Sequence, residues 1–222
     1  MQETVFYAYA GACLVVGYFF GCISTGYFVG RFFHQDIRRL GSGNAGTTNV
    51  LRNFGKLPAL ITFVGDVAKA IVPILLIRFL FPTEPVWYLL GLYCGLGAVL
   101  GHNFPFYLGF KGGKGIAVTA AVIVSTAHPI VMPVGLLIFI LVVAVTRYVS
   151  VGSLLVAWII PVNTFLFYRG DQMFLHMLII SLLFTVFAYF QHRQNIVRLI
   201  HGNENKLFKT KKEKEAEKHE TN

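Results

Sequence analysis

Charged side chains are scarce in this 222-residue sequence, where Asp, Glu, Lys and Arg together make up 13% of the residues. A soluble domain carries about 25%. Hydrophobic residues account for 55% and gather in blocks long enough to cross a bilayer, which takes about 20 residues of helix. The composition therefore excludes an ordinary soluble domain and predicts an all-α polytopic membrane protein. We expect a single membrane domain over residues 1–205 and a basic, disordered tail over residues 206–222, where the sequence is of low complexity.

Groups that could bind a metal or a cofactor are also few. Cys13, Cys22 and Cys94 fall inside apolar blocks and lack metal-ligand spacing, so we expect reduced, packed thiols. Outside the apolar blocks and before the tail, the segments assigned below to the cytoplasm offer only Asp36 and Glu204 as carboxylates, too few for a convincing Mg²⁺ site. No His-x-x-x-x-Asp occurs, which excludes the usual signature of soluble and peripheral glycerolipid acyltransferases. We expect no metal and no cofactor.

Seven apolar segments are predicted to span the membrane. The fourth and fifth form one run interrupted only by Ala127, His128 and Pro129. Unbroken, this run would make about 45 Å of helix, longer than the hydrocarbon core of about 30 Å. We therefore divide it at Pro129. The seven predicted spans are 5–30, 57–81, 86–107, 115–128, 130–146, 151–168 and 172–190.

The distribution of basic residues supports seven spans over six. With seven, 16 of the 19 Lys and Arg residues lie on one face, and Arg169 is the clear exception in a loop of the other face. The positive-inside rule then places the N-terminus outside and the tail in the cytoplasm. Six spans would export the basic tail. The net charge of +9 does not indicate nucleic-acid binding, because no basic stripe is interleaved with exposed aromatics.

The first polar segment on the predicted cytoplasmic face is LGSGNAGTTN at residues 40–49, followed by Arg52. Glycines beside small hydroxyl and amide side chains allow backbone N–H groups to turn toward an anion. Arg52 can add a bidentate fork for phosphate. A flexible linker is the alternative interpretation. The candidate site residues here are Ser42, Gly43, Asn44, Gly46, Thr48, Asn49 and Arg52.

The second polar segment, residues 101–115, ends in KGGKG before an apolar helix and is a plausible phosphate cradle at a helix N-terminus. It is not a Walker A loop, because the glycine spacing is one residue short and Gly115 stands where Ser or Thr would hold Mg²⁺. His102 is either a packed histidine or a ligand. The candidate binding residues are His102, Lys111, Gly112, Gly113, Lys114 and Gly115.

The third polar segment, QHRQNIVRLIHGNE at residues 191–204, follows the last span. His192 and Asn195 are three residues apart, so on a helix they share a face and can hold a substrate hydroxyl. The alternative is an interfacial helix end with snorkelling Arg193 and Arg198. Two weaker signals are Ser150, which can equally cap a helix, and an Asp66–Lys69 pair inside the second span. For the pair, a structural role is favoured over a substrate role.

In these segments the sequence resembles the bacterial acyl-phosphate-dependent glycerol-3-phosphate acyltransferases, the PlsY family. The resemblance covers most of the chain and rests on motifs in the same order. They are SGNAGTTN at 42–49, Gly101 and His102 with FKGGKG at 110–115, RYVS at 147–150, and HRQNI at 192–196 with Gly202 and Glu204.

The resemblance implies a seven-helix bundle in the bacterial inner membrane with its active site on the cytoplasmic face. It would transfer a fatty acyl group from acyl phosphate to the 1-hydroxyl of sn-glycerol 3-phosphate, with membrane lipids as its surroundings. By similarity, Ser42 and Arg52 serve glycerol 3-phosphate, and Ser150, His192 and Asn195 complete that site. Residues 111–115 resemble the family's phosphate-binding motif, and Glu204 is similar to a residue thought to maintain structure.

Two questions stay open at this point. The base for the attacking hydroxyl is either His192 or the substrate's own phosphate. A transporter or channel for phosphate or a phosphorylated metabolite would use the same glycines and cations. Against transport, the motifs crowd one face, whereas transporter sites usually lie at the midplane. An acyltransferase that uses acyl-CoA or acyl-ACP is a third reading, although nothing in the sequence resembles an adenine site.

Overall fold

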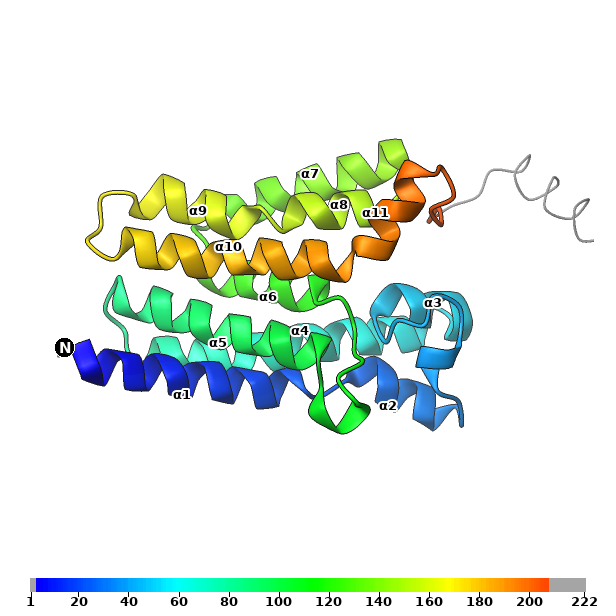
Figure 1. The fold of residues 1–222 in the computed structure, drawn as a ribbon, viewed down its shortest axis with the longest axis horizontal. Helices are drawn as coiled ribbons and strands as arrows, with labels where there is room; N and C mark the ends of the chain where they lie inside the picture. The colour runs from blue at the N-terminus through cyan, green and yellow to red at the C-terminus, as the bar shows by residue number, and fades with distance from the viewer. Residues whose placement is uncertain (1–2, 208–222) are drawn as a thin grey trace, which may run out of the picture.

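The computed structural model describes residues 3–207, which form a bundle of α-helices with no strand among them (Figure 1). Two short 3₁₀ helices, η1 (Ile37–Arg39) and η2 (Phe106–Leu108), lie in the loops. The α-helices are α1 (Glu3–Gly21), α2 (Thr25–Phe32), α3 (Thr47–Phe54), α4 (Lys56–Leu80), α5 (Val86–Asn103), α6 (Ile116–Thr126), α7 (Val131–Thr146), α8 (Val149–Val156), α9 (Ile159–Tyr168), α10 (Phe174–Gln191) and α11 (Arg193–Ile200).

Five helical segments in the described part of the chain are long and apolar enough to cross a membrane. They are Thr4–Phe32, Lys56–Leu80, Val86–Leu108, Val149–Tyr168 and Phe174–Gln191. The predicted interruption at Pro129 is present, since α6 ends before it and α7 begins after it. Helix α6 has 11 residues, about 16 Å of helix, which is shorter than the hydrocarbon core. The all-helical membrane class is confirmed, while the count of seven crossings stays a prediction.

Two predicted spans contain a break that the sequence prediction did not include. Between α8 and α9 the cause is Pro161, whose ring nitrogen has no hydrogen to donate to the carbonyl four residues earlier. That carbonyl belongs to Ala157, and its oxygen accepts a hydrogen bond from Thr185 Oγ1 at 2.7 Å. A side chain of α10 therefore satisfies the backbone at the break.

The first predicted span is broken between α1 and α2. Side chains from other helices again satisfy the backbone there. The Cys22 carbonyl oxygen accepts from the Tyr107 hydroxyl at 2.8 Å, and the Ile23 carbonyl oxygen accepts from Lys69 Nζ at 2.8 Å. Because unpaired backbone groups are costly in an apolar environment, these contacts allow the chain to leave helical geometry inside the bundle.

Glycines set the close approach of α1 and α5, which lie side by side (Figure 1). A Cβ on Gly17 would collide with the Cys94 carbonyl oxygen, and one on Gly97 would collide with the Leu14 carbonyl oxygen. Gly21 and Gly101 are equally close to the facing backbone. Gly17 and Gly21 on α1, and Gly97 and Gly101 on α5, each form a G-x-x-x-G step, and both steps serve the packing of this pair of helices.

The three polar segments lie together at the end of the bundle away from the N-terminus of α1 (Figure 1). Helix α3 carries the end of the first segment, the loop before α6 the second, and α11 the third. Helix α7 packs on α8 and α9.

Candidate functional site

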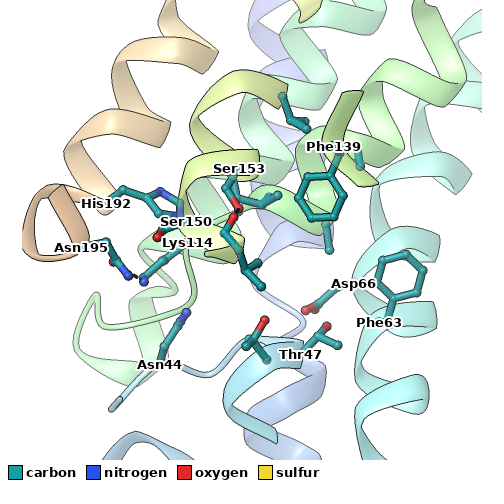
Figure 2. A pocket seen from close by; sticks show the side chains of 18 of the residues that line it. Asn44, Thr47, Phe63, Asp66, Lys114, Phe139, Ser150, Ser153, His192 and Asn195 are labelled. Atoms are coloured by element: carbon teal, nitrogen blue, oxygen red, sulfur yellow. Dashed lines mark hydrogen bonds between the residues drawn. The ribbon is translucent and has the colours of Figure 1, made fainter. Parts of the chain in front are cut away.

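A cavity of about 500 Å³ opens where the three polar segments meet (Figure 2). One end is polar and the other is apolar. The polar end is lined by Ser42, Asn44, Gly46, Thr47, Thr48, Asn49, Arg52, Asp66, His102, Lys114, Gly115, Ser150, Ser153, His192, Asn195, Arg198, Glu204 and Asn205. The other lining residues are apolar or glycine, and they include residues of α6 and α7 beyond the polar segments: Phe63, Ile116, Ala117, Ala120, Ile123, Val124, Met132, Gly135, Leu136, Phe139, Val149, Val156 and Ile159.

Most of the predicted site residues line this cavity, including Ser42, Arg52, His192 and Asn195. Four do not: Gly43, Lys111, Gly112 and Gly113. The cavity also contains residues to which the sequence assigned no binding role. Thr47 opens α3, Asp66 was interpreted as half of a structural pair, and Arg198 as a snorkelling side chain. The sequence could have indicated a binding role for Thr47, because this residue lies within the GTTN run of the first motif.

The first polar loop is organised by Asn49, whose side chain is buried on α3. Its Nδ2 donates to the carbonyl oxygens of Leu40 and Asn44, each at 2.9 Å, and its Oδ1 accepts from the Ser42 N–H at 3.1 Å. Gly43 adopts φ +71° and donates its N–H to Leu40 at 2.9 Å. Asn49 and Gly43 therefore shape the loop that presents Ser42 and Asn44 to the cavity.

The second loop places only its last residues at the cavity. The Gly112 N–H donates to the Asn103 carbonyl oxygen at 3.1 Å, and the Gly113 N–H donates to the His102 carbonyl oxygen at 3.0 Å. These two amides are therefore occupied by the end of α5 and cannot form the predicted phosphate cradle with the same protons. Gly115, at φ +82°, caps α6. The first turn of α6, whose N–H groups have no intrahelical acceptor, lines the cavity instead.

Lys114 joins this loop to the third polar segment. Its ammonium donates to Asn195 Oδ1. Asn195 Nδ2 donates to Glu204 Oε1 at 2.6 Å, and Glu204 Oε2 accepts from Arg198 Nε at 2.7 Å. Burial lowers the pKa of Lys114 to about 8, and the nearby positive charge of Arg198 acts in the same direction. The network thus holds a lysine that is still mostly charged at pH 7 against one wall of the cavity.

His192 is buried at the junction of α10 and α11. Its Nδ1 lies 2.8 Å from the carbonyl oxygen of Ala188. A carbonyl only accepts, so Nδ1 carries the proton and Nε2 keeps its lone pair. Burial, with a smaller contribution from the charge of Lys114, lowers the pKa of His192 to about 4. The imidazole is therefore neutral at physiological pH and can accept a proton at Nε2.

Several buried polar atoms of the cavity wall have no hydrogen-bond partner among the described residues. They are Ser150 Oγ, Thr47 Oγ1 and Asn44 Oδ1. Buried polar groups in proteins are normally paired. Figure 2 shows Ser150, Lys114, His192 and Asn195 gathered on one side, across the cavity from Asp66 and Phe63. This arrangement has the composition of a site for a polar, anionic group. Over residues 3–207, no group of three or more His, Cys, Asp or Glu side chains is placed to hold a metal ion.

The fold and the cavity define a class of protein. This is a helical membrane protein whose cavity combines cationic and other polar lining residues with apolar ones, the composition of a site for an amphipathic anion. The family is shown by sequence, since the family model described as glycerol-3-phosphate acyltransferase matches residues 11–202. The chain belongs to the glycerol-3-phosphate acyltransferase family.

Curated relatives and solved structures agree with this assignment. A glycerol-3-phosphate acyltransferase of Thermoanaerobacter pseudethanolicus is 38% identical over 90% of this chain and 96% of its own length. One of Clostridioides difficile is 40% identical over 87% of this chain and 93% of its own. Crystal structures of PlsY, an integral membrane glycerol 3-phosphate acyltransferase, are also similar. The glycerol 3-phosphate form has a TM-score of 0.78, with 32% identity over 90% of this chain and 96% of that one. The lysophosphatidic acid form has a TM-score of 0.74, with 30% identity over 89% and 94%.

Proposed function

We propose that this enzyme transfers a fatty acyl group from acyl phosphate to the 1-hydroxyl of sn-glycerol 3-phosphate. The products are lysophosphatidic acid and inorganic phosphate, and the reaction serves phospholipid biosynthesis. One observation carries the proposal. A single cavity joins a cationic end, with Arg52 and Lys114, to an apolar end between α4, α6 and α7. A transporter for a phosphorylated metabolite would not need the apolar end, because its substrate has no hydrocarbon chain to bind there.

The apolar end fits a hydrocarbon chain. Phe63 lies on α4, Val124 on α6, and Met132, Leu136 and Phe139 on α7, and all of them line the cavity. Val124 and Leu136 are about half exposed, at 52% and 54%, so apolar surface is accessible in this part of the structure. An acyl chain that packs against these side chains is shielded from water.

At the polar end, positive charge and backbone donors neutralise the two anionic substrates. Arg52, Lys114 and the first turn of α6 take the phosphoryl oxygens, and Ser150 Oγ pairs with glycerol 3-phosphate. The hydroxyl oxygen attacks the acyl carbon, the bond from that carbon to the phosphate oxygen breaks, and phosphate departs with the bonding electrons. Because acyl phosphate is a mixed anhydride with a good leaving group, alignment and electrostatics supply most of the catalysis.

The proton of the attacking hydroxyl goes to His192 Nε2 in this proposal. The position supports it, since Nδ1 is engaged with Ala188 and Nε2 has no hydrogen-bond partner among residues 3–207. The competing route passes the proton to the substrate's own phosphate. His192→Asn separates the two, because an asparagine has no basic lone pair, and near-normal turnover at saturating substrate rules out the histidine.

We also propose seven crossings of a bacterial inner membrane, with the N-terminus outside and the site on the cytoplasmic face. Helices α6 and α7 add two short crossings to the five long segments. Among the described residues, the three polar segments lie at the same end of the bundle, and they carry several of its Lys and Arg residues (Figure 1). The single domain then runs over residues 1–205. The N–H of Leu207 still donates to the Arg147 carbonyl oxygen at 2.8 Å. Most of the predicted disordered tail, residues 208–222, lies outside the described residues.

The test uses the purified full-length protein in detergent, with acyl phosphate and glycerol 3-phosphate. We expect equal amounts of phosphate and lysophosphatidic acid. Parallel reactions with acyl-CoA and acyl-ACP decide the donor, and the proposal requires acyl phosphate to be preferred. Phosphate release without lysophosphatidic acid contradicts the transfer. Flux of glycerol 3-phosphate into liposomes without product supports the transporter.

A further inference from the structure

A buried trio of polar side chains forms the wall of the cavity opposite His192. Asp66 and Lys69 lie one turn apart on α4, and His102 lies on α5. They are 1%, 4% and 3% exposed. The chemistry proposed above uses none of them, yet both Asp66 and His102 line the cavity. Burying charged side chains is costly even when they are paired, so we expect this trio to have a functional role.

Lys69 uses all three of its protons. Its Nζ lies 2.8 Å from the Ile23 carbonyl oxygen, 2.9 Å from Asp66 Oδ1 and 2.8 Å from His102 Nδ1. An ammonium group only donates, so His102 Nδ1 must accept. Asp66 Oδ1 itself lies 3.6 Å from that nitrogen, too far for a hydrogen bond. A neutral His102 therefore carries its proton on Nε2.

The two histidines of the cavity thus present opposite chemistry. His192 donates from Nδ1 to Ala188 and faces the cavity as an acceptor. His102 accepts at Nδ1 from Lys69 and is left with an N–H donor at Nε2. Within the described part of the chain, this N–H has no protein acceptor. A donor that the fold orients and leaves unused beside a cavity is available to a ligand.

The position of Nε2 points to the kind of ligand. The imidazole lies beneath the KGGKG loop, so close to Gly113 that a Cβ there would collide with Nε2. A side chain larger than that of glycine at position 113 would therefore displace this ring, although Gly113 does not line the cavity. The next residues, Lys114 and Gly115, and the first turn of α6 do line it. The His102 N–H is therefore adjacent to the groups expected to hold phosphate.

We propose that Lys69 and Asp66 are positioning residues that fix His102 in the Nε2–H tautomer, and that His102 donates this hydrogen bond to a phosphoryl oxygen of a substrate. The proposal rests on the proposed function for the identity of the substrates. Asp66 and Lys69 cancel each other's charge, so the wall presents a directed donor without a net negative charge that would repel phosphate. Without Lys69, either ring nitrogen of His102 could carry the proton, and the donor would be lost part of the time.

The first test is independent of turnover. Full-length protein labelled with ¹⁵N-histidine is studied by NMR in lipid nanodiscs, and His102 is identified among the seven histidines by the His102→Gln variant. We expect a protonated Nε2 and an unprotonated Nδ1. The Asp66→Asn/Lys69→Met double variant avoids an uncompensated buried charge and should show a mixture of tautomers. A proton on Nδ1 in the wild-type protein overturns the proposal.

The second test is kinetic. His102→Phe keeps the ring and loses the donor, whereas the amide nitrogen of His102→Gln can reach the position of Nε2. A hydrogen bond to a charged group supports a rise of about tenfold or more in KM for acyl phosphate or for glycerol 3-phosphate in the phenylalanine variant. The glutamine variant should recover most of this loss. Gly113→Ala, which displaces the ring, should resemble the phenylalanine variant.

His176→Phe is the matched control. His176 lies on α10, contacts the Tyr93 hydroxyl at 2.6 Å and does not line the cavity, so both KM values should be unchanged. Unchanged KM values in His102→Phe overturn the proposal, as does equal impairment of the glutamine and phenylalanine variants at equal folded amounts. An inactive wild-type protein contradicts the proposed function instead, and the NMR result and calorimetric binding of glycerol 3-phosphate then decide the role of His102.

Discussion

The pKa of Lys114 leads to a quantitative prediction for substrate binding. Burial lowers this pKa to about 8 from the ordinary value of 10.5, so the ammonium is charged below pH 8 and loses its charge above it. The ratio of charged to neutral lysine is about 10:1 at pH 7 and about 1:10 at pH 9. A phosphate monoester has a second pKa of about 6 and stays a dianion over this range. If only charged Lys114 binds it, KM for glycerol 3-phosphate rises about tenfold between pH 7 and pH 9.

The assay measures lysophosphatidic acid formation at saturating acyl phosphate, with glycerol 3-phosphate varied at each pH. Reactions without enzyme correct for hydrolysis of the donor. Lys114→Arg keeps its charge throughout, so its KM should be flat, whereas Lys114→Met should show a high KM at every pH. His192, with a pKa of about 4, is neutral over the whole window and does not contribute.

Two results would refute this reasoning. A wild-type KM that does not change from pH 7 to pH 9 would mean that the charge of Lys114 does not contact the phosphate. A rise that persists in Lys114→Arg would assign the titration to another group. Thermal unfolding at pH 7 and pH 9 checks that each variant remains folded.

Three further predictions concern packing, the base and the lysine network. Gly17→Ala should lower the free energy of unfolding by roughly 1–3 kcal/mol, because its Cβ meets the backbone of α5. Gly11→Ala on the same helix, with nothing within 4 Å, should be neutral in the same thermal-unfolding assay in detergent, and equal melting temperatures would disprove the packing argument. His192→Asn should lower kcat about 100-fold or more with a smaller change in KM, measured at saturating substrate. Glu204→Gln weakens the contacts that orient Asn195 and should raise KM for glycerol 3-phosphate about tenfold. An unchanged KM would mean that Lys114 does not need this network.

The membrane class and the residues of the polar end were readable from the sequence because each depends on local information. Apolar blocks of about 20 residues identify membrane helices without knowledge of their neighbours. Glycines, hydroxyls and cations clustered between such blocks indicate an anion site for the same reason. Twelve residues chosen in this way, from Ser42 to Asn195, do line one cavity. The break at Pro129 was readable too, because proline ends helices through its own geometry.

Other features depended on contacts between distant segments. The break between α1 and α2 needs Tyr107 and Lys69 to pair its carbonyls, and neither lies nearby in sequence. Gly112 and Gly113 look like phosphate ligands in a glycine-rich loop, yet their amides bond to the end of α5. Arg198 looks like a snorkelling residue until Glu204 is seen beside it.

The sequence by itself determined that this chain is a membrane protein with glycine-rich, cationic segments suited to an anion, since hydropathy, charge and glycine content act locally. Only the tertiary structure decided what each histidine can do. His102 and His192 are the same residue type in similar polar segments. Which ring nitrogen holds the proton depends on the neighbour of the other nitrogen, a lysine from another helix in one case and a backbone carbonyl in the other. That choice is made by packing.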